Sequence, residues 1–274
     1  MKNNFFHRLR ALLSPNAPLF GRAGLHERRI ATQFAGRCRF AGDAPVFARR
    51  LILLGFTNRS GSTLLAEYLR QSGRVAGGME LLNHDIVATQ VASHPADDFP
   101  VYITGLVHRL GGDDGDAFCL KASWDQIAML YRWNIPAMFR STRMIHIRRA
   151  DVVGQAVSHA IADQTKSWTS QQHAAGITPV FDARRIGAII ARQARAHDAI
   201  ALAAQVLDVP CVDITYEQLA TAPTLHVQRV LGACGVDVAP GWQVRATVLQ
   251  KQATAVNAGF AARYRAILRS SLTG

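Results

Sequence analysis

The stretch LILLGFTNRSGSTLLAEYL, from Leu51 to Leu69, constrains the fold more than any other part of this chain. Its first six residues form an apolar run without alternation, which is typical of a parallel strand buried on both faces. A loop of small residues follows, and after it comes a helical pattern made by Leu64, Leu65, Tyr68 and Leu69. Strand, small-residue loop and helix together predict a site where backbone N–H groups and the helix dipole bind an anion.

This loop differs from the P-loop of nucleotide triphosphatases. The pattern G-x-x-x-x-G-K-[ST] requires a lysine between Gly61 and Thr63, where this chain has Ser62. The cation of the loop is Arg59, on the other side of the glycine. A kinase or ATPase without the lysine would lack its main contact to the terminal phosphates, so we expect the anion to be bound differently.

Composition supports a folded chain with an anionic partner. The 274 residues fit a basic, partly helical lead-in at 1–50, with a short helix near 25–34, and one α/β domain at 51–274. A hydrophobic content of 49% supports a sizeable core. The net charge of +12 indicates nucleic acid, anionic lipid or a phosphorylated small molecule, or else reflects a GC-rich genome. Because the arginines are scattered and no recognisable binding module occurs, nucleic acid is not expected.

Cysteine usage and hydropathy favour a cytoplasmic protein. The four cysteines stand far apart without a C-x-x-C pair, which argues against zinc and against a disulfide framework. No apolar run approaches the ~20 residues of a membrane span. The N-terminal MKNNFFHRLRALL carries Arg8 and Arg10 within its apolar part, which is unlike a signal peptide. Whether this segment packs on its own domain or lies on the inner face of the membrane stays open, as does a homodimer.

The strand-to-helix order recurs along the chain. FCLKASW at 118–124 predicts a strand that ends in a lysine, and a helix is expected at 125–133. RMIHIRRADVVGQAVSHAIAD at 143–163 predicts a strand with Arg148 and Arg149 at its carboxyl end, then a helix with Asp151 near its start. These units predict an α/β, P-loop-like three-layer fold, in which helices flank a central, mostly parallel sheet and the ligand lies at its carboxyl edge.

The rest of the chain adds helices and connections. A long amphipathic helix is expected at 184–207, a strand and turn at 209–219, a helix at 224–234 and a basic helical tail. Residues 93–117, with two prolines and the run GGDDGD, predict an exposed connection around a weak helix near 101–110. The connections at 85–117 and 166–183 are expected to shape a substrate pocket, because loops at strand ends carry specificity.

With these motifs in order, the chain resembles sulfotransferases that use 3′-phosphoadenosine-5′-phosphosulfate. It is most similar to the bacterial carbohydrate branch, which includes the trehalose and nodulation-factor enzymes. The family loop reads approximately [PQ]-R-S-G-[ST]-[ST], and here Asn58 stands in the first place. Further likeness lies in GGMELLN, RRADVVGQAVS, QTKSW, ITYEQL and LQKQATAVNAGFAARYR. The likeness runs discontinuously from about Leu51 to Arg265 and so covers most of the chain.

The resemblance implies transfer of a sulfuryl group to a hydroxyl of a carbohydrate or glycolipid by in-line displacement, without a metal. The 5′-phosphate is expected on the loop residues Ser60, Gly61, Ser62 and Thr63. Arg59 is expected at the bridging oxygen, where negative charge grows as the sulfuryl group departs. Glu80, which falls on the glutamate of the family segment GGMELLN, is the expected base for the acceptor hydroxyl.

The 3′-phosphate distinguishes this cofactor, and its product adenosine 3′,5′-bisphosphate, from ATP. The resemblance assigns it to Arg148 or Arg149 together with Ser158, and the spacing to Ser158 leaves the choice of arginine open. Lys251 in the tail is a lesser candidate for the same phosphate. Trp168 either lines the cofactor or acceptor site or belongs to the core.

Two other functions remain open on the sequence. One is sulfation of protein tyrosine by the same chemistry, and the other is a non-catalytic nucleotide or nucleic-acid binding module. The presence of both Arg59 and Glu80 argues against the module, because binding alone needs no base. His84 and His159 neighbour proposed site residues, although a lone histidine is more often structural or on the surface.

Overall fold

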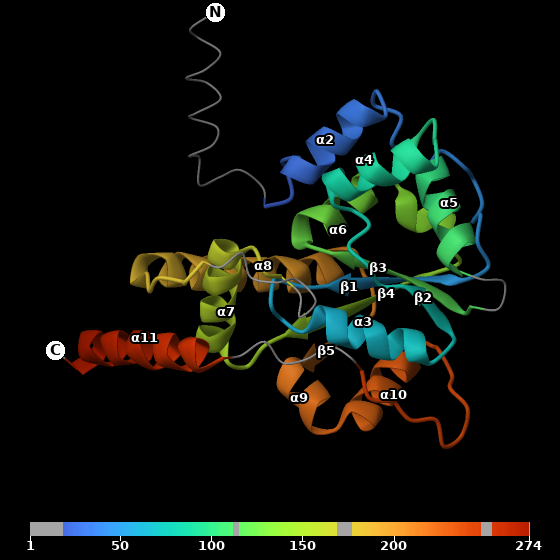
Figure 1. Cartoon of the computed structure of the whole chain (residues 1–274). Helices are drawn as coiled ribbons and strands as arrows, with labels where there is room; N and C mark the ends of the chain where they lie inside the picture. The colour runs from blue at the N-terminus through green and yellow to red at the C-terminus, as the bar shows by residue number, and fades with distance from the viewer. Residues whose placement is uncertain (1–18, 112–114, 169–176, 248–253, 274) are drawn as a thin grey trace, which may run out of the picture.

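The computed structural model describes residues 19–111, 115–168, 177–247 and 254–273, and within them a parallel sheet forms the centre of the molecule (Figure 1). The sheet has five strands in the order β2-β3-β1-β4-β5, all parallel. The strands are β1 (Arg50–Gly55), β2 (Val75–Gly77), β3 (Ala117–Ala122), β4 (Thr142–Arg148) and β5 (Cys211–Thr215). The predicted α/β class with a central parallel sheet is confirmed.

Helices cover both faces of this sheet. They are α2 (Leu25–Gln33), α3 (Ser62–Gln71), α4 (His84–Ser93), α5 (Phe99–Gly111), α6 (Trp124–Arg132), the 3-10 helix η1 (Ile135–Met138), α7 (Val152–Thr165), α8 (Ala183–Val206), α9 (Tyr216–Thr221), α10 (Pro223–Ala233) and α11 (Ala255–Thr273). Figure 1 shows α2, α4, α5 and α6 on one side of the sheet and α3, α9 and α10 on the other. The molecule therefore has the three layers that were predicted.

Strand β1 explains the apolar run from Leu51 to Phe56. Leu51 and Leu53 point into a core shared with α2, α5 and α6, whereas Ile52 and Leu54 point into a second core shared with α3 and α10. All four side chains are fully buried. A strand covered on both faces needs an apolar residue at every position, and this is the pattern of the sequence.

A third, smaller core joins helices α7, α8 and α11 beside the sheet. It contains Ala156 and Ala160 of α7, Ile186 and Ile189 of α8, and Tyr264 of α11. The N-terminal end of α7 follows directly after strand β4. This packing therefore holds the tail helix α11 next to the carboxyl edge of the sheet.

The helix predicted near 101–110 is confirmed as α5, but the described part of 93–117 is not the exposed connection that the sequence predicted. Helix α5 is thirteen residues long and buries an apolar face, made of Phe99, Tyr102, Ile103, Leu106 and Val107. The prediction of an exposed connection was wrong because Pro100 is typical of loops as well as of helix N-termini. At the second position of a helix a proline is tolerated, since its missing N–H would have no intrahelical partner. Helix α4 and the short edge strand β2 were also not predicted.

Two predictions of the sequence fall outside the described residues, namely the amphipathic N-terminal segment and Lys251. The predicted helix at 25–34 is confirmed as α2, and the boundary at residue 50 stays a prediction. None of the helices in the described ranges combines the length and the apolar character needed to cross a bilayer.

Candidate functional site

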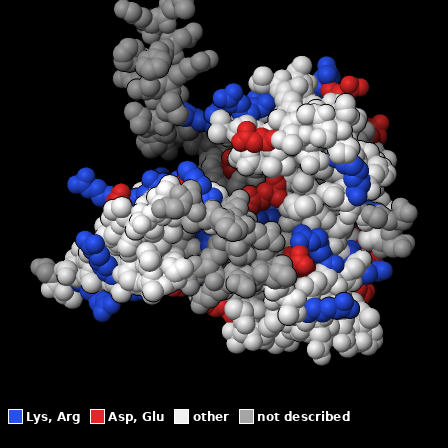
Figure 2. All heavy atoms as spheres, in the orientation of Figure 1, with Lys and Arg blue, Asp and Glu red and all other residues white. Residues whose placement is uncertain are grey.

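A pocket of about 1370 Å³ opens at the carboxyl ends of strands β1, β3 and β4. It is lined by seven residues that the sequence predicted, Arg59, Gly61, Ser62, Thr63, Glu80, Arg149 and Ser158. Ligand pockets usually enclose roughly 300–1,000 Å³, so this one has room for a nucleotide and a second ligand. Figure 2 shows acidic and basic side chains gathered together in the hollowed middle of this face.

The loop after β1 is held in a backbone conformation that few residues adopt. Gly61 has φ +90°, and a Cβ there would lie 2.6 Å from Cδ2 of Tyr216, so the position requires glycine. Arg59 has φ +66°, which costs an ordinary residue about 1–2 kcal/mol. Gln155 and Gln193 both donate to the backbone carbonyl of Asn58, and these bonds hold the loop in place.

The start of helix α3 offers hydrogen-bond donors to the pocket. Gly61 is its N-cap residue, and no side chain caps the first turn, which begins at Ser62. Beneath the loop, Oγ of Ser60 is fully buried and has no hydrogen-bond partner among the described residues. Uncapped N–H groups at a helix N-terminus, with the dipole behind them, bind anions. The loop therefore has the local structure that the sequence predicted for a phosphate site.

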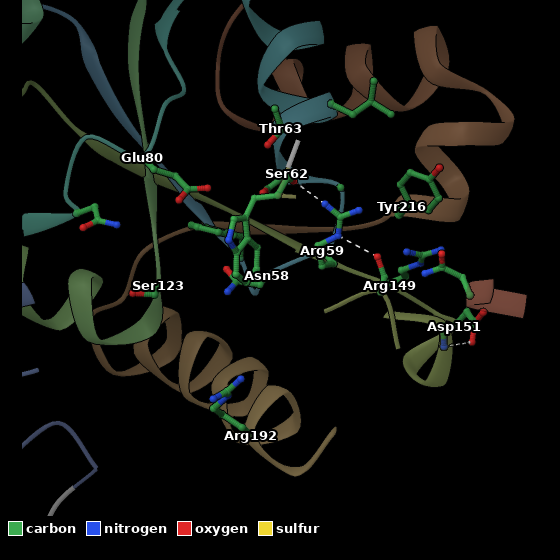
Figure 3. Close-up of a pocket in the computed structure, with 18 of the residues that line it drawn as sticks. Asn58, Arg59, Ser62, Thr63, Glu80, Ser123, Arg149, Asp151, Arg192 and Tyr216 are labelled. Carbon is green, nitrogen blue, oxygen red and sulfur yellow. Dashed lines mark hydrogen bonds between the residues drawn. The ribbon is translucent and has the colours of Figure 1, made fainter. Parts of the chain in front are cut away.

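Arg59 reaches across from the loop to helix α7. Its Nε donates to Oγ of Ser158 at 2.9 Å, and one terminal nitrogen donates to the backbone carbonyl of Trp168 at 2.6 Å. Burial and the nearby cation of Arg149 lower the pKa of Arg59, although a guanidinium stays charged at neutral pH. Arg59 is thus a fixed positive charge at the wall between the loop and α7 (Figure 3).

Lys121, at the end of strand β3, is a site residue that the sequence analysis missed. Its Nζ donates to Oε1 of Glu80 at 2.8 Å and to Oγ1 of Thr63 at 3.2 Å, and it lies over the ring of Phe56. The lysine is buried, whereas the side chain of Glu80 is about half exposed. A buried lysine is rare unless it is paired, so the strand-ending lysine in FCLKASW was the available signal.

The two candidate arginines after β4 have different surroundings. Arg149 lines the pocket, and its guanidinium lies over the ring of Tyr216. Its buried Nε has no hydrogen-bond partner in the described part of the chain, although it forms an ion pair with Glu217 at 3.8 Å. Arg148 is half exposed and pairs with Asp213 of β5 at 3.5 Å. Figure 3 shows Arg149 at the end of the pocket opposite Glu80. Arg149, rather than Arg148, is therefore the arginine that can meet a ligand here.

The two histidines that neighbour the predicted site residues, His159 and His84, have different surroundings. His159 is buried, contacts Gln193 and the ring of Trp168, and does not line the pocket, and burial lowers its pKa to about 4. His84 lies at the start of α4 and contacts His26. We interpret His159 as a packing residue behind the wall, while Trp168 belongs to the pocket lining.

Of the two connections predicted to shape the pocket, 166–183 contributes Trp168 to its lining. The described residues of 85–117 contribute nothing to the lining, because α4 and α5 pack against the core instead. The first turns of α2 and α6 take that place, with Leu25 and His26 from α2 and Asp125 from α6. Within the described ranges, no three metal-ligating side chains gather, and the expectation of a metal-free site stays a prediction.

Comparisons with known proteins identify a family for this chain. The family model described as Stf0 sulphotransferase matches residues 51–267. No curated protein matches the chain. Among the solved structures that are similar to the chain are two sulfotransferase domains. The sulfotransferase domain from the Synechococcus PCC 7002 olefin synthase shares 15% identity, with TM-score 0.48, over 83% of this chain and 90% of that one. The sulfotransferase domain from the curacin biosynthetic pathway shares 14% identity, with TM-score 0.43, over 81% of this chain and 99% of that one.

Proposed function

Because the chain belongs to the Stf0 sulphotransferase family, we propose that it moves a sulfuryl group from 3′-phosphoadenosine-5′-phosphosulfate to a hydroxyl of a carbohydrate or glycolipid. One observation carries the proposal. The ammonium of Lys121 contacts both Thr63 of the anion-binding loop and the carboxylate of Glu80. Phosphate-binding groups and a candidate base thus belong to one pocket, as transfer between two bound ligands requires.

The residues at the loop end fit a doubly phosphorylated nucleotide. The N–H groups at the start of α3 and the partnerless hydroxyl of Ser60 suit a 5′-phosphate. At a separate place in the pocket, Nε of Arg149 is buried without a hydrogen bond and lies 3.8 Å from Oε1 of Glu217, so the guanidinium keeps donors for a second phosphate. Oγ of Ser158 accepts a hydrogen bond from Arg59, so its O–H can still donate to either phosphate. When bound, the phosphosulfate supplies the sulfuryl group that is transferred.

The side chains of the chain itself divide the chemistry between two ends of the pocket. Arg59 and Lys121 provide fixed cations beside the loop, where they neutralise negative charge on a phosphate oxygen. Glu80 lies on the other side of Lys121 and can accept the proton of a hydroxyl that attacks from there. Because the two cations and the carboxylate are positioned before substrates bind, little reorganisation is needed during transfer.

The pocket lining and the cysteines bear on the acceptor and on the cellular compartment. The lining of the acceptor end is polar, with Asn83, Ser123 and Asp125 near Glu80, which supports a hydroxylated acceptor such as a sugar over the aromatic ring of tyrosine. The four cysteines are all free, which supports a reducing compartment such as the cytoplasm.

The test is replacement of the proposed base. Glu80→Gln should fold, bind adenosine 3′,5′-bisphosphate as the wild type does, and lose turnover by roughly two to four decades, the usual contribution of a general base. Turnover is measured with radiolabelled phosphosulfate and a carbohydrate and lipid extract, and bisphosphate binding by calorimetry.

The matched control is Glu67→Gln, since Glu67 pairs with Arg70 on α3 and does not line the pocket. Turnover of Glu80→Gln at the wild-type rate, together with an inactive His84→Ala, would assign the base to the histidine. A wild-type protein that binds no bisphosphate would refute the proposal that 3′-phosphoadenosine-5′-phosphosulfate is the sulfuryl donor.

A further inference from the structure

Helix α2 precedes the residues that the family model matches, yet it forms a fixed part of the pocket wall. The carboxylate of Glu27 is buried and forms an ion pair with Arg132 of α6. Ile30 is fully buried, and Phe34, which ends the helix, is nearly so, and both belong to the main core. These contacts anchor α2 on α6, so its first turn has a defined position at the pocket.

In that first turn, contacts with α4 fix the tautomer of His26. The backbone N–H of His84 donates to Nδ1 of His26 at 3.1 Å, and Nδ1 of His84 lies 2.9 Å from the same atom. Burial lowers the pKa of His26, so the ring is neutral at pH 7. Because Nδ1 accepts these bonds, the proton of the neutral ring is on Nε2. The described residues give this Nε2–H no hydrogen-bond partner.

The surroundings of His26 belong to the acceptor end of the pocket. Glu80 and Asp125 are close enough to act electrostatically on its ring, and Leu25 beside it is 51% exposed. Asp125 lies at the start of α6 and accepts a bond from the hydroxyl of Ser123. A donor on His26, a carboxylate on Asp125 and an apolar surface on Leu25 are complementary to a hydroxylated molecule with an apolar face.

We propose that His26 determines acceptor specificity, by donating its Nε2–H to an oxygen of the acceptor beside the hydroxyl that reacts at Glu80. Asp125 accepts a hydrogen bond from the same acceptor. The inference rests on the proposed function, since it assigns the α2 end of the pocket to the molecule that receives the sulfuryl group. It gives the segment before residue 51 a direct role in selecting the substrate.

The experiment measures transfer of radiolabelled sulfate to two probes, methyl α-glucoside and trehalose, alongside calorimetric binding of the bisphosphate. His26→Ala should raise KM for the probe about three- to tenfold, the usual effect of one neutral hydrogen bond, with kcat and bisphosphate affinity unchanged. His26→Gln retains an N–H donor and should recover most of the lost affinity. The control is Arg29→Gln, on the exposed side of the same helix.

The possible results separate this inference from the function on which it rests. An unchanged KM in His26→Ala overturns the inference and leaves the proposed function standing. Equal losses in His26→Ala and His26→Gln also overturn it, because they would indicate a packing role, which thermal unfolding of both variants would reveal. A wild-type enzyme that binds the bisphosphate but transfers to neither sugar overturns it as well. Absence of bisphosphate binding in the wild type refutes the donor, and the inference with it.

Discussion

Arg149→Ala should abolish most of the preference for adenosine 3′,5′-bisphosphate over AMP, whereas Arg148→Ala should leave that preference intact. The two arginines are neighbours in sequence but differ in their surroundings. The side chain of Arg149 is 17% exposed and lines the pocket, and its buried Nε lies 3.8 Å from Glu217 without a hydrogen-bond partner in the described structure. That of Arg148 is 50% exposed and pairs with Asp213. We therefore expect a phosphate in the pocket to be bound by Arg149 rather than by Arg148.

The expected magnitude follows from this burial. A charge-assisted hydrogen bond in a partly buried site contributes about 1.5–3 kcal/mol, which corresponds to roughly one to two decades in Kd. For Arg148, whose partner is a solvent-exposed carboxylate, screening leaves about 0–1 kcal/mol at most, and none of it involves the ligand. The ratio of the two affinities should thus fall about 10- to 100-fold in Arg149→Ala and less than about twofold in Arg148→Ala.

Calorimetric titration of both variants with both nucleotides provides the assay. AMP is the internal control, because a general distortion of the pocket would weaken both ligands equally, while loss of the 3′-phosphate contact weakens the bisphosphate alone. Glu217 keeps its bonds to the backbone N–H groups of Ala150 and Asp151 after the substitution, so the turn should survive. A bisphosphate preference that disappears in Arg148→Ala and persists in Arg149→Ala would refute the reasoning.

Two further predictions concern catalysis and stability. Arg59→Ala should lower kcat by roughly two to three decades while the bisphosphate affinity falls much less, because its charge is needed most as negative charge develops; an unchanged kcat with a raised KM would mean that Arg59 only anchors the ligand. The folded protein should lose stability as the pH falls from about 6.5 to about 4, because burial lowers the pKa of His146, His159 and His197 to about 4 while the unfolded chain takes up protons near 6.5. A Tm that stays constant between pH 7 and pH 4.5 would contradict this.

Much of the fold was readable in the sequence where one pattern had one structural cause. The run from Leu51 to Phe56 predicted a strand buried on both faces, and the helices at 125–133, 184–207 and 224–234 were found within a few residues of their predicted bounds. The strand has the unbroken apolar run of an element buried on both faces, and each helix has an apolar face with the helical period. The short strand β2 has only three residues and one neighbour, so it leaves no period to detect.

The candidate site could be located from the sequence at the loop and only in part elsewhere. The loop residues are consecutive, and local sequence therefore describes their surroundings. Lys121 was not predicted as a site residue, because its contact with the loop depends on β3 lying next to β1. The sequence does not reveal that pairing. The role of Arg149 depends likewise on Tyr216, which belongs to a distant helix. His26 was overlooked because it lies in the lead-in, far from any recognised motif.

The position of β1 between β3 and β4 also bears on how the site comes into being. Leu51 pairs with Phe118 on one side and with Thr142 on the other, so the central strands join only when distant parts of the chain meet. Such long-range pairing requires closure of large loops and forms late in folding. The loop at 57–63 is held by Gln155 and Gln193 from distant helices, and Lys121 and Arg149 likewise join the site only through this pairing. A substitution that weakens the central pairing therefore reduces the number of active molecules, while each molecule that does fold carries a normal site.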